Sequence, residues 1–246
     1  MIELVGFDGD DTLWHSEGYF QAVHAEFERV LGRYIDLADA RVHERLLATE
    51  QANLHLFGYG AKGMTLSMLE TAIALTDERM SVADLHHLLQ LGKDILRHPV
   101  ELLDGIREAV EAVARECRVV LVTKGDLFHQ EAKVAASGLG GLFHRIEIVS
   151  EKDEGAYRRV LREFDVDGPR FLMIGNSLRS DIEPVLALGG WGIHMPYHVT
   201  WAHEARHAVD LGHPRLLQVE APVDIPAALR ELQSRAVAPP PAVRAY

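Results

Sequence analysis

A cluster of carboxylates follows a short apolar run near the N-terminus. Asp8-Gly9-Asp10-Asp11-Thr12 comes directly after Ile2–Phe7, which has the composition of a buried strand. Ligands of open α/β sheets bind at the carboxyl ends of the strands. Grouped carboxylates at that place need a counter-charge, and a divalent cation with oxygen ligands supplies it most simply. An acidic turn is the alternative interpretation, because Asp and Gly are common turn residues.

Three later segments carry groups that complement these carboxylates, and each follows a predicted strand. Thr123 offers a small hydroxyl that suits an anion, and Lys152 offers an ammonium that can offset several carboxylates. Gly175-Asn176-Ser177 is followed by Asp181 near the start of the next predicted helix. If the strands are parallel neighbours, a nucleophilic carboxylate, a hydroxyl, a lysine and a second acidic metal ligand converge at one edge of the sheet.

Hydrophobic patterning predicts the elements that position these residues. Helical stripes such as Tyr157, Val160, Leu161 and Phe164 lie between short apolar runs. The alternation predicts an α/β fold with a doubly wound, mostly parallel sheet of the Rossmann-like kind. Strands buried on both faces of such a sheet are expected at Ile2–Phe7, Arg118–Val122, Arg145–Val149, Arg170–Ile174, Trp191–Met195 and Arg215–Val219.

One long region breaks this alternation. Residues 15–98 contain several helical stripes and no convincing strand, which predicts an all-helical insert after the first strand. The α/β core then consists of residues 1–14 and 99–235. Residues 236–246 include three consecutive prolines and are expected to form a flexible C-terminal tail.

Composition excludes several classes of function. The chain has 246 residues, of which 48% are hydrophobic and 25% are charged, as in globular proteins. Its net charge of −12 argues against a nucleic-acid-binding or anionic-membrane-binding face. No apolar run is long enough to span a bilayer, and Met1–Gly9 does not resemble a signal peptide. A lone cysteine, Cys117, rules out an internal disulfide, and we expect a cytoplasmic protein.

The four motifs, in this order and each after a predicted strand, resemble those of the haloacid dehalogenase-like (HAD) superfamily of phosphotransferases. The helical insert resembles the C1-type cap of that family. The resemblance implies that Asp8 is the nucleophile and Asp10 the general acid/base, while Thr123 and Lys152 hold the phosphoryl group. It also implies that Mg²⁺ is bound by Asp8, the backbone carbonyl of Asp10 and Asp181.

Two positions refine the resemblance. The family often has an acid where this chain has Asn176, which we expect to contact a metal-bound water or to orient a neighbouring ligand. The dehalogenase branch typically lacks an acid at the position of Asp10, because a departing halide needs no proton, so Asp10 favours phosphoryl transfer. The phosphonate-cleaving branch needs a cap lysine, and the insert offers only Lys62 and Lys93.

These observations predict a Mg²⁺-dependent phosphatase that hydrolyses a small phosphorylated metabolite through an aspartyl-phosphate intermediate. A phosphomutase and a catalytically weak, phosphometabolite-binding regulatory protein of the same fold remain as alternatives. Specificity is expected from the glycine-punctuated turn Leu56–Gly63, where Tyr59 can stack on a substrate and Lys62 can meet an anionic group. A plain connection between two helices is the alternative for that turn.

The chain is rich in histidine, and one segment matches a zinc-protease pattern. His203-Glu204-Ala205-Arg206-His207 has the H-E-x-x-H form, but chance matches are common in a chain with 14 histidines. The segment also lies beyond the fifth predicted strand of an α/β core, which is the wrong context for that motif. The sequence assigns no role to the histidine-rich stretch from His194 to His207.

Overall fold

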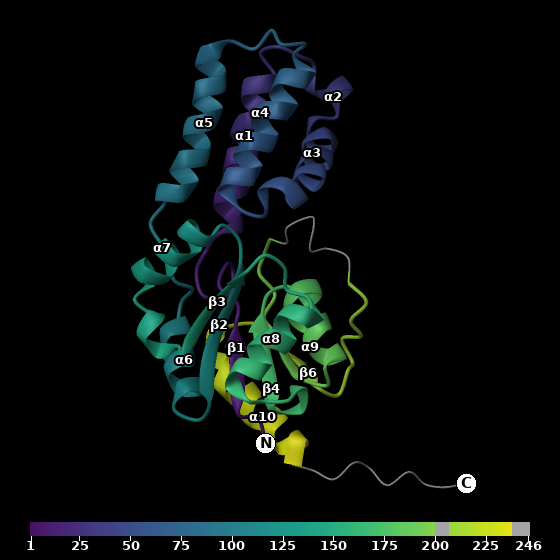
Figure 1. Cartoon of the computed structure of the whole chain (residues 1–246). Coiled ribbons are helices and arrows are strands. Elements are labelled where there is room, and N and C mark those ends of the chain that lie inside the picture. The colour runs from purple at the N-terminus through teal and green to yellow at the C-terminus, as the bar shows by residue number, and fades with distance from the viewer. Residues whose placement is uncertain (200–206, 238–246) are drawn as a thin grey trace, which may run out of the picture. The chain divides into compact units, whose positions relative to one another are not determined.

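The computed structural model describes residues 1–199 and 207–237, and they divide into two compact units. The first unit contains residues 1–15, 101–123 and the chain from 137 onward, and the second contains residues 16–100 and 124–136. Figure 1 shows the elements of both. The sequence-based division assigns 124–136 to the α/β core, whereas in the structure this segment groups with the helical insert.

The first unit is built on a six-stranded parallel sheet, which confirms the predicted fold class. The strand order is β3-β2-β1-β4-β5-β6, so the first strand lies in the middle of the sheet. The strands are β1 (Leu4–Phe7), β2 (Arg118–Lys124), β3 (Arg145–Val149), β4 (Phe171–Gly175), β5 (Trp191–His194) and β6 (Leu216–Gln218).

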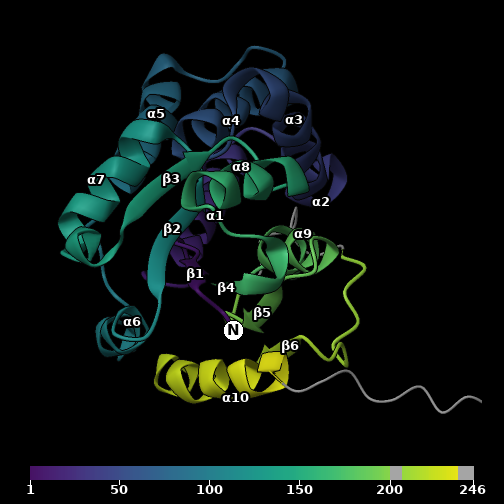
Figure 2. The ribbon, with the colours of Figure 1, turned by 60° about the horizontal axis from the view of Figure 1, so that its bottom comes forward.

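Helices cover both faces of this sheet, as Figure 2 shows. The helices α6 (Ile106–Ala114) and α10 (Ile225–Val237) pack together on one face, and α8 (Glu154–Phe164) and α9 (Glu183–Ala187) pack together on the other. Short helical turns complete the unit at Gly140–Leu142, Gly168–Arg170, Leu178–Ile182 and Pro222–Asp224. The last helix, α10, includes residues 236 and 237 of the predicted tail, and residues 238–246 lie outside the described part of the chain.

The second unit is helical, and the predicted all-helical insert is confirmed. Its helices pack around a core of buried apolar side chains that includes Phe27, Leu31, Met68 and Leu88. The unit contains α1 (Glu17–Leu31), α2 (Leu37–Ala40), α3 (Val42–Phe57), α4 (Ala61–Leu75), α5 (Val82–Arg97) and most of α7 (Leu127–Ser137). None of the helices in the described residues is long and apolar enough to cross a membrane.

The strand β3 departs from the prediction of burial on both faces. It lies at the edge of the sheet, where only β2 covers its hydrogen-bonding side. Its residues are half-buried or exposed, and Ile146 is 38% exposed. Arg145 and Glu147 form an ion pair on this strand. Charged side chains at an edge strand protect it against pairing with other chains.

Candidate active site

Asp8 begins the site, one residue beyond the end of β1. The register places Phe7 opposite Leu121 of β2 and Ile174 of β4, so Asp8 leaves the sheet between β2 and the end of β4. The amide of Asp8 donates to the carbonyl of Ile174 at 2.9 Å, which continues the ladder by one residue. The side chain of Asp8 is buried. The central position of β1 therefore holds this carboxylate between β2 and the loop that follows β4.

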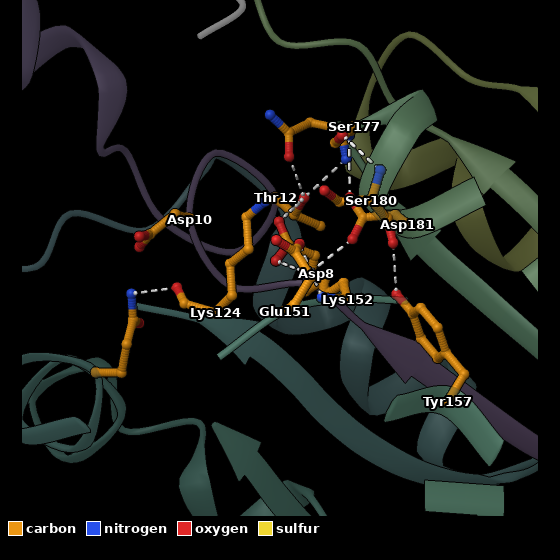
Figure 3. A network of polar contacts seen from close by, with 12 residues as sticks. Asp8, Asp10, Thr12, Lys124, Glu151, Lys152, Tyr157, Ser177, Ser180 and Asp181 are labelled. Carbon is orange, nitrogen blue, oxygen red and sulfur yellow. Dashed lines mark hydrogen bonds and ion pairs between the residues drawn. The ribbon is translucent and has the colours of Figure 1, made fainter. Parts of the chain in front are cut away.

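A buried lysine joins two carboxylates from distant parts of the chain, as Figure 3 shows. Lys152 donates from Nζ to Oδ1 of Asp8 and, at 2.7 Å, to Oδ1 of Asp181. The side chains of all three residues are at most 9% exposed. Thr12 donates from Oγ1 to the other oxygen of Asp8 at 3.0 Å. Both oxygens of Asp8 are thus held in place by hydrogen-bond donors.

The charges at this cluster do not cancel. The pKa of Asp8 is raised to about 7, because burial raises it more than Lys152 lowers it and the neighbouring carboxylate of Asp181 adds to the rise. Burial alone lowers the pKa of Lys152, but the two carboxylates outweigh it and the net pKa lies above its ordinary value. One ammonium therefore faces two carboxylates in a buried site, and a further cation is needed to stabilise both in the ionised form.

Asp181 is fixed by the loop and the π-helical turn that follow β4. Its Oδ2 accepts a hydrogen bond from the amide of Ser177 at 3.0 Å. Gly175 lies so close that an added Cβ would be 2.2 Å from the same oxygen, so only glycine fits there. Tyr157 of α8 donates from its hydroxyl to the carbonyl of Ser180 at 3.0 Å and anchors the turn from the side. The π-helical turn Leu178–Ile182 thus carries a fully buried carboxylate.

Asn176 joins the cluster through Thr12. The amide of Asn176 donates to Thr12 Oγ1 at 3.1 Å, and Thr12 Oγ1 lies 3.4 Å from Asn176 Oδ1. His194, at the end of β5, contacts the carbonyl of Asn176 through Nε2 at 3.1 Å. Because burial lowers the pKa of His194, this ring is neutral near pH 7 and its Nε2–H donates to that carbonyl. The loop after β4 is therefore supported from two neighbouring strands.

Asp10 and Thr123 lie on the same edge of the sheet but make different contacts. Figure 3 shows the carboxylate of Asp10 pointing away from the cluster around Lys152. It accepts a hydrogen bond from the indole Nε1 of Trp14 at 2.6 Å. Thr123 is buried, and its Oγ1 would lie 3.0 Å from a Cβ added to Gly9, so its hydroxyl stands directly beside the backbone of the Asp8–Asp10 turn.

Tyr59 and Lys62 belong to the second unit and contact the segment that follows β2. Lys62 forms an ion pair with Asp126, with 2.9 Å between Nζ and Oδ2, and its Nζ lies 5.1 Å from the ring centre of Phe128. The ring of Tyr59 lies under Nζ of Lys124 at 4.4 Å. Both side chains therefore hold the 124–136 segment within this unit. His203 and Glu204 of the zinc-protease pattern lie outside the described residues.

Several contacts were not predicted from the sequence. Thr12 stood in the first motif without a role, and its spacing of four residues from Asp8 was the only signal of their contact. Trp14 stands at the same spacing from Asp10, and this spacing was the only signal of their contact. Tyr157 and His194 contact the site through backbone carbonyls, which leave no trace in the sequence.

Comparisons with known proteins place this geometry in a family. The family model "haloacid dehalogenase-like hydrolase" matches residues 2–189. A haloacid dehalogenase-like family hydrolase from Xanthomonas campestris is 55% identical, and the match covers 96% of this chain and 97% of that chain with a TM-score of 0.87. No curated protein has a significantly matching sequence.

Two more distant structures share the fold. A 2-haloacid dehalogenase from Pseudomonas syringae is 18% identical over 96% of this chain and 99% of that chain, with a TM-score of 0.60. The HAD-hydrolase YfnB from Bacillus subtilis, bound to magnesium, is 20% identical over 93% of this chain and 98% of that chain, with a TM-score of 0.59. The family match over most of the chain and the 55% identity show that this protein belongs to the haloacid dehalogenase-like hydrolases.

Proposed function

We propose that the protein is a Mg²⁺-dependent phosphatase that hydrolyses a small phosphorylated metabolite through an aspartyl-phosphate on Asp8. The observation that carries the proposal is the buried cluster at the end of β1. There Lys152 and Thr12 hold both oxygens of one carboxylate, and a second carboxylate, Asp10, stands two residues further along. A fixed carboxylate next to an acid/base group is the arrangement that two-step phosphoryl transfer requires.

In the first step, an oxygen of Asp8 attacks the phosphorus atom of the substrate. The bond between phosphorus and the ester oxygen breaks, and Asp10 gives its proton to the departing alkoxide. Lys152 neutralises charge on the phosphoryl oxygens, and Thr123 donates from its hydroxyl to one of them. A positioned general acid contributes about 10²–10⁴-fold to such a step.

In the second step, water attacks the phosphorus atom of the aspartyl-phosphate. Asp10, now ionised, takes a proton from that water, and the bond between phosphorus and the Asp8 oxygen breaks. Inorganic phosphate leaves, and the carboxylate of Asp8 is regenerated. The same side chain, Asp10, serves as acid and then as base.

The donors present fit a magnesium ion. Within residues 1–199 and 207–237 no three His, Cys, Asp or Glu side chains gather as a metal site of their own. Magnesium commonly takes one or two carboxylates and completes its shell with water and substrate phosphate. Asp8, Asp181 and the carbonyl of Asp10 would hold the ion, and Asn176 would orient a water bound to it. When bound, the ion offsets the repulsion between a carboxylate nucleophile and a phosphate dianion.

Asp10 favours phosphate esters over haloacids as substrates. The fold does not separate the two chemistries, because a dehalogenase shares it. A departing halide needs no proton, whereas an alkoxide does. An ionisable side chain at this position has a task only in phosphoryl transfer.

The proposed function is tested by measuring phosphate release from a panel of phosphorylated metabolites, with Mg²⁺ and with chelator. Halide release from 2-haloacids is measured in parallel. We expect phosphate release that requires Mg²⁺ and is lost in Asp8→Asn. Halide release without phosphate release would overturn the proposal, and binding of phosphorylated ligands without turnover would indicate a regulatory protein instead. Transfer to a second substrate hydroxyl would indicate a mutase.

We further propose that the turn carrying Tyr59 and Lys62 selects the substrate. Lys62 is half-exposed at 49%, so its ammonium is accessible although it is paired with Asp126. Gly58 and Gly60 lie in the turn between α3 and α4 and have positive φ angles of 70° and 103°. Tyr59 lies between these two glycines and Lys62 lies in the first turn of α4, while the residues proposed for the chemistry belong to the first unit.

A further inference from the structure

Trp14 makes a contact with Asp10 that packing alone does not explain. Its indole Nε1 donates to Oδ1 of Asp10 at 2.6 Å. The side chain of Trp14 is 1% exposed, whereas Asp10 is half-buried. The ring therefore fills space in the interior and directs its single polar atom at a carboxylate that reaches solvent. A phenylalanine or leucine would serve if the position required bulk only.

The backbone around Trp14 leaves the indole little freedom. The carbonyl of Trp14 accepts from the amide of Asp11 at 2.7 Å, and Asp11 adopts a left-handed conformation with a φ of 60°. Trp14 also bridges to Leu102 on the returning chain. A Cβ added to Gly9 would lie 2.9 Å from Cζ2 of the indole, so the ring rests directly on the glycine backbone. The donor is thus fixed relative to the turn that carries Asp8 and Asp10.

The carboxylate of Asp10 differs in direction from those of Asp8 and Asp181. In Figure 3 the carboxylate of Asp10 points away from Asp8 and Lys152. The two oxygens of Asp8 are engaged by Lys152 and Thr12, and those of Asp181 by Lys152 and the amide of Ser177. The indole N–H of Trp14 is a donor that holds the Asp10 carboxylate in this direction.

We propose that Trp14 is a positioning residue for Asp10, in which the indole N–H fixes the direction of the carboxylate that exchanges protons with the leaving group and with water. The proposal rests on the proposed phosphatase function. A hydrogen bond to a charged group also orients it, and misplacing a general acid reduces the rate of the step that needs its proton. The effect should therefore grow with the basicity of the leaving group.

The first test is Trp14→Phe, which keeps the aromatic bulk and removes the N–H. We expect kcat/KM for an alkyl phosphate to fall by about 10- to 100-fold, with KM little changed. For p-nitrophenyl phosphate the loss should be below about 3-fold, because nitrophenolate leaves without a proton. In Asp10→Asn, adding Trp14→Phe should cause no further loss. An equal loss on both esters, an unchanged or higher kcat/KM on the alkyl ester, or independent losses in the double variant would overturn the proposal.

Trp191→Phe is a matched control. Trp191 is also buried, and its Nε1 donates to the carbonyl of Pro169 at 2.9 Å, at the start of β5 and away from the strand ends that carry the site. This variant loses an indole hydrogen bond without touching Asp10. We expect a lower melting temperature and no dependence of activity on the leaving group. The same leaving-group dependence in Trp191→Phe would show that the effect of Trp14→Phe is structural.

A second readout does not depend on activity. The indole N–H resonance of Trp14 is identified by its absence in Trp14→Phe, and it should shift and exchange faster with solvent in Asp10→Ala, while that of Trp191 stays in place. A Trp14 resonance that stays in place in Asp10→Ala would contradict the hydrogen bond between Trp14 and Asp10. A wild-type protein that hydrolyses neither ester would overturn the proposed function, whereas an active wild type with an insensitive Trp14→Phe would overturn only the role of Trp14.

Discussion

Replacing the proposed nucleophile should stabilise the metal-free protein. Burial raises the pKa of Asp8 from 3.8 to about 7. A carboxyl group with a raised pKa in the folded state contributes stability that is fully present below its unfolded value, and this stability is lost as the pH rises through about 7. Asp8→Asn stays neutral at every pH and keeps the shape of the side chain. The variant should therefore gain stability over the wild type as the pH rises.

The structure sets the size of this gain. The shift of about 3 pK units corresponds to an upper limit of about 4 kcal/mol above pH 7. At about pH 5 the same relation leaves about 2 kcal/mol, and below about pH 3 the difference vanishes. Lys152 does not alter this profile, because its raised pKa keeps it protonated throughout the range. An asparagine carbonyl can still accept from Lys152, and its amide can donate to Thr12.

The assay is urea unfolding in the presence of chelator at about pH 5 and pH 8. Asp167→Asn is a suitable control, because Asp167 is an exposed carboxylate whose pKa is lowered by a hydrogen bond from Arg170. That variant should be no more stable than the wild type at either pH. A gain for Asp8→Asn that is absent at pH 8, or equal at both pH values, would refute the account of uncompensated buried charge.

Three further outcomes are expected. Asp181→Asn should weaken Mg²⁺ binding at least about 10-fold in a calorimetric titration while the fold persists, and unchanged affinity would exclude this carboxylate as a ligand. Gly9→Ala should lower both the melting temperature and kcat, because the new Cβ would lie 2.9 Å from the indole of Trp14, and wild-type values of both would count against that close contact. Tyr59→Ala and Lys62→Ala should each lower kcat/KM for the best metabolite by about 5- to 150-fold and spare p-nitrophenyl phosphate, and equal losses on both substrates would remove the turn from substrate selection.

The strands of the sheet could be predicted from short apolar runs, because central parallel strands are buried on both faces. Leu4–Phe7 and Phe171–Gly175 are fully buried, and short apolar runs like these have few interpretations other than a buried strand. The edge strand Arg145–Val149 is similarly short and carries two charged residues, and its exposure follows from its place at the edge of the sheet. The apolar runs identified which segments form strands, but they did not indicate the order of the strands in the sheet.

The site was predictable where a motif ends a strand, and less so where the contact is made by backbone or by a distant segment. Asp8, Lys152 and Asp181 converge because β1, β3 and β4 run in parallel. The π-helical turn that carries Asp181 has no sequence signal of its own, since it depends on Gly175 and on tertiary contacts. The grouping of residues 124–136 with the insert depends on side-chain pairs such as Lys62 with Asp126. Such pairs join residues that are far apart in the sequence, so the sequence pattern does not predict them.

The covalent step on Asp8 is tested most directly by acid-quenched single turnover with the best phosphorylated substrate, followed by mass spectrometry of the peptide that contains Asp8. We expect one phosphoryl group on this peptide, located on the Asp8 side chain, to rise before inorganic phosphate appears and to decay as it is released. In Asp10→Asn the modified peptide should decay more slowly, because water then lacks its base. Release of inorganic phosphate with Asp8 unmodified at every time point would contradict the mechanism.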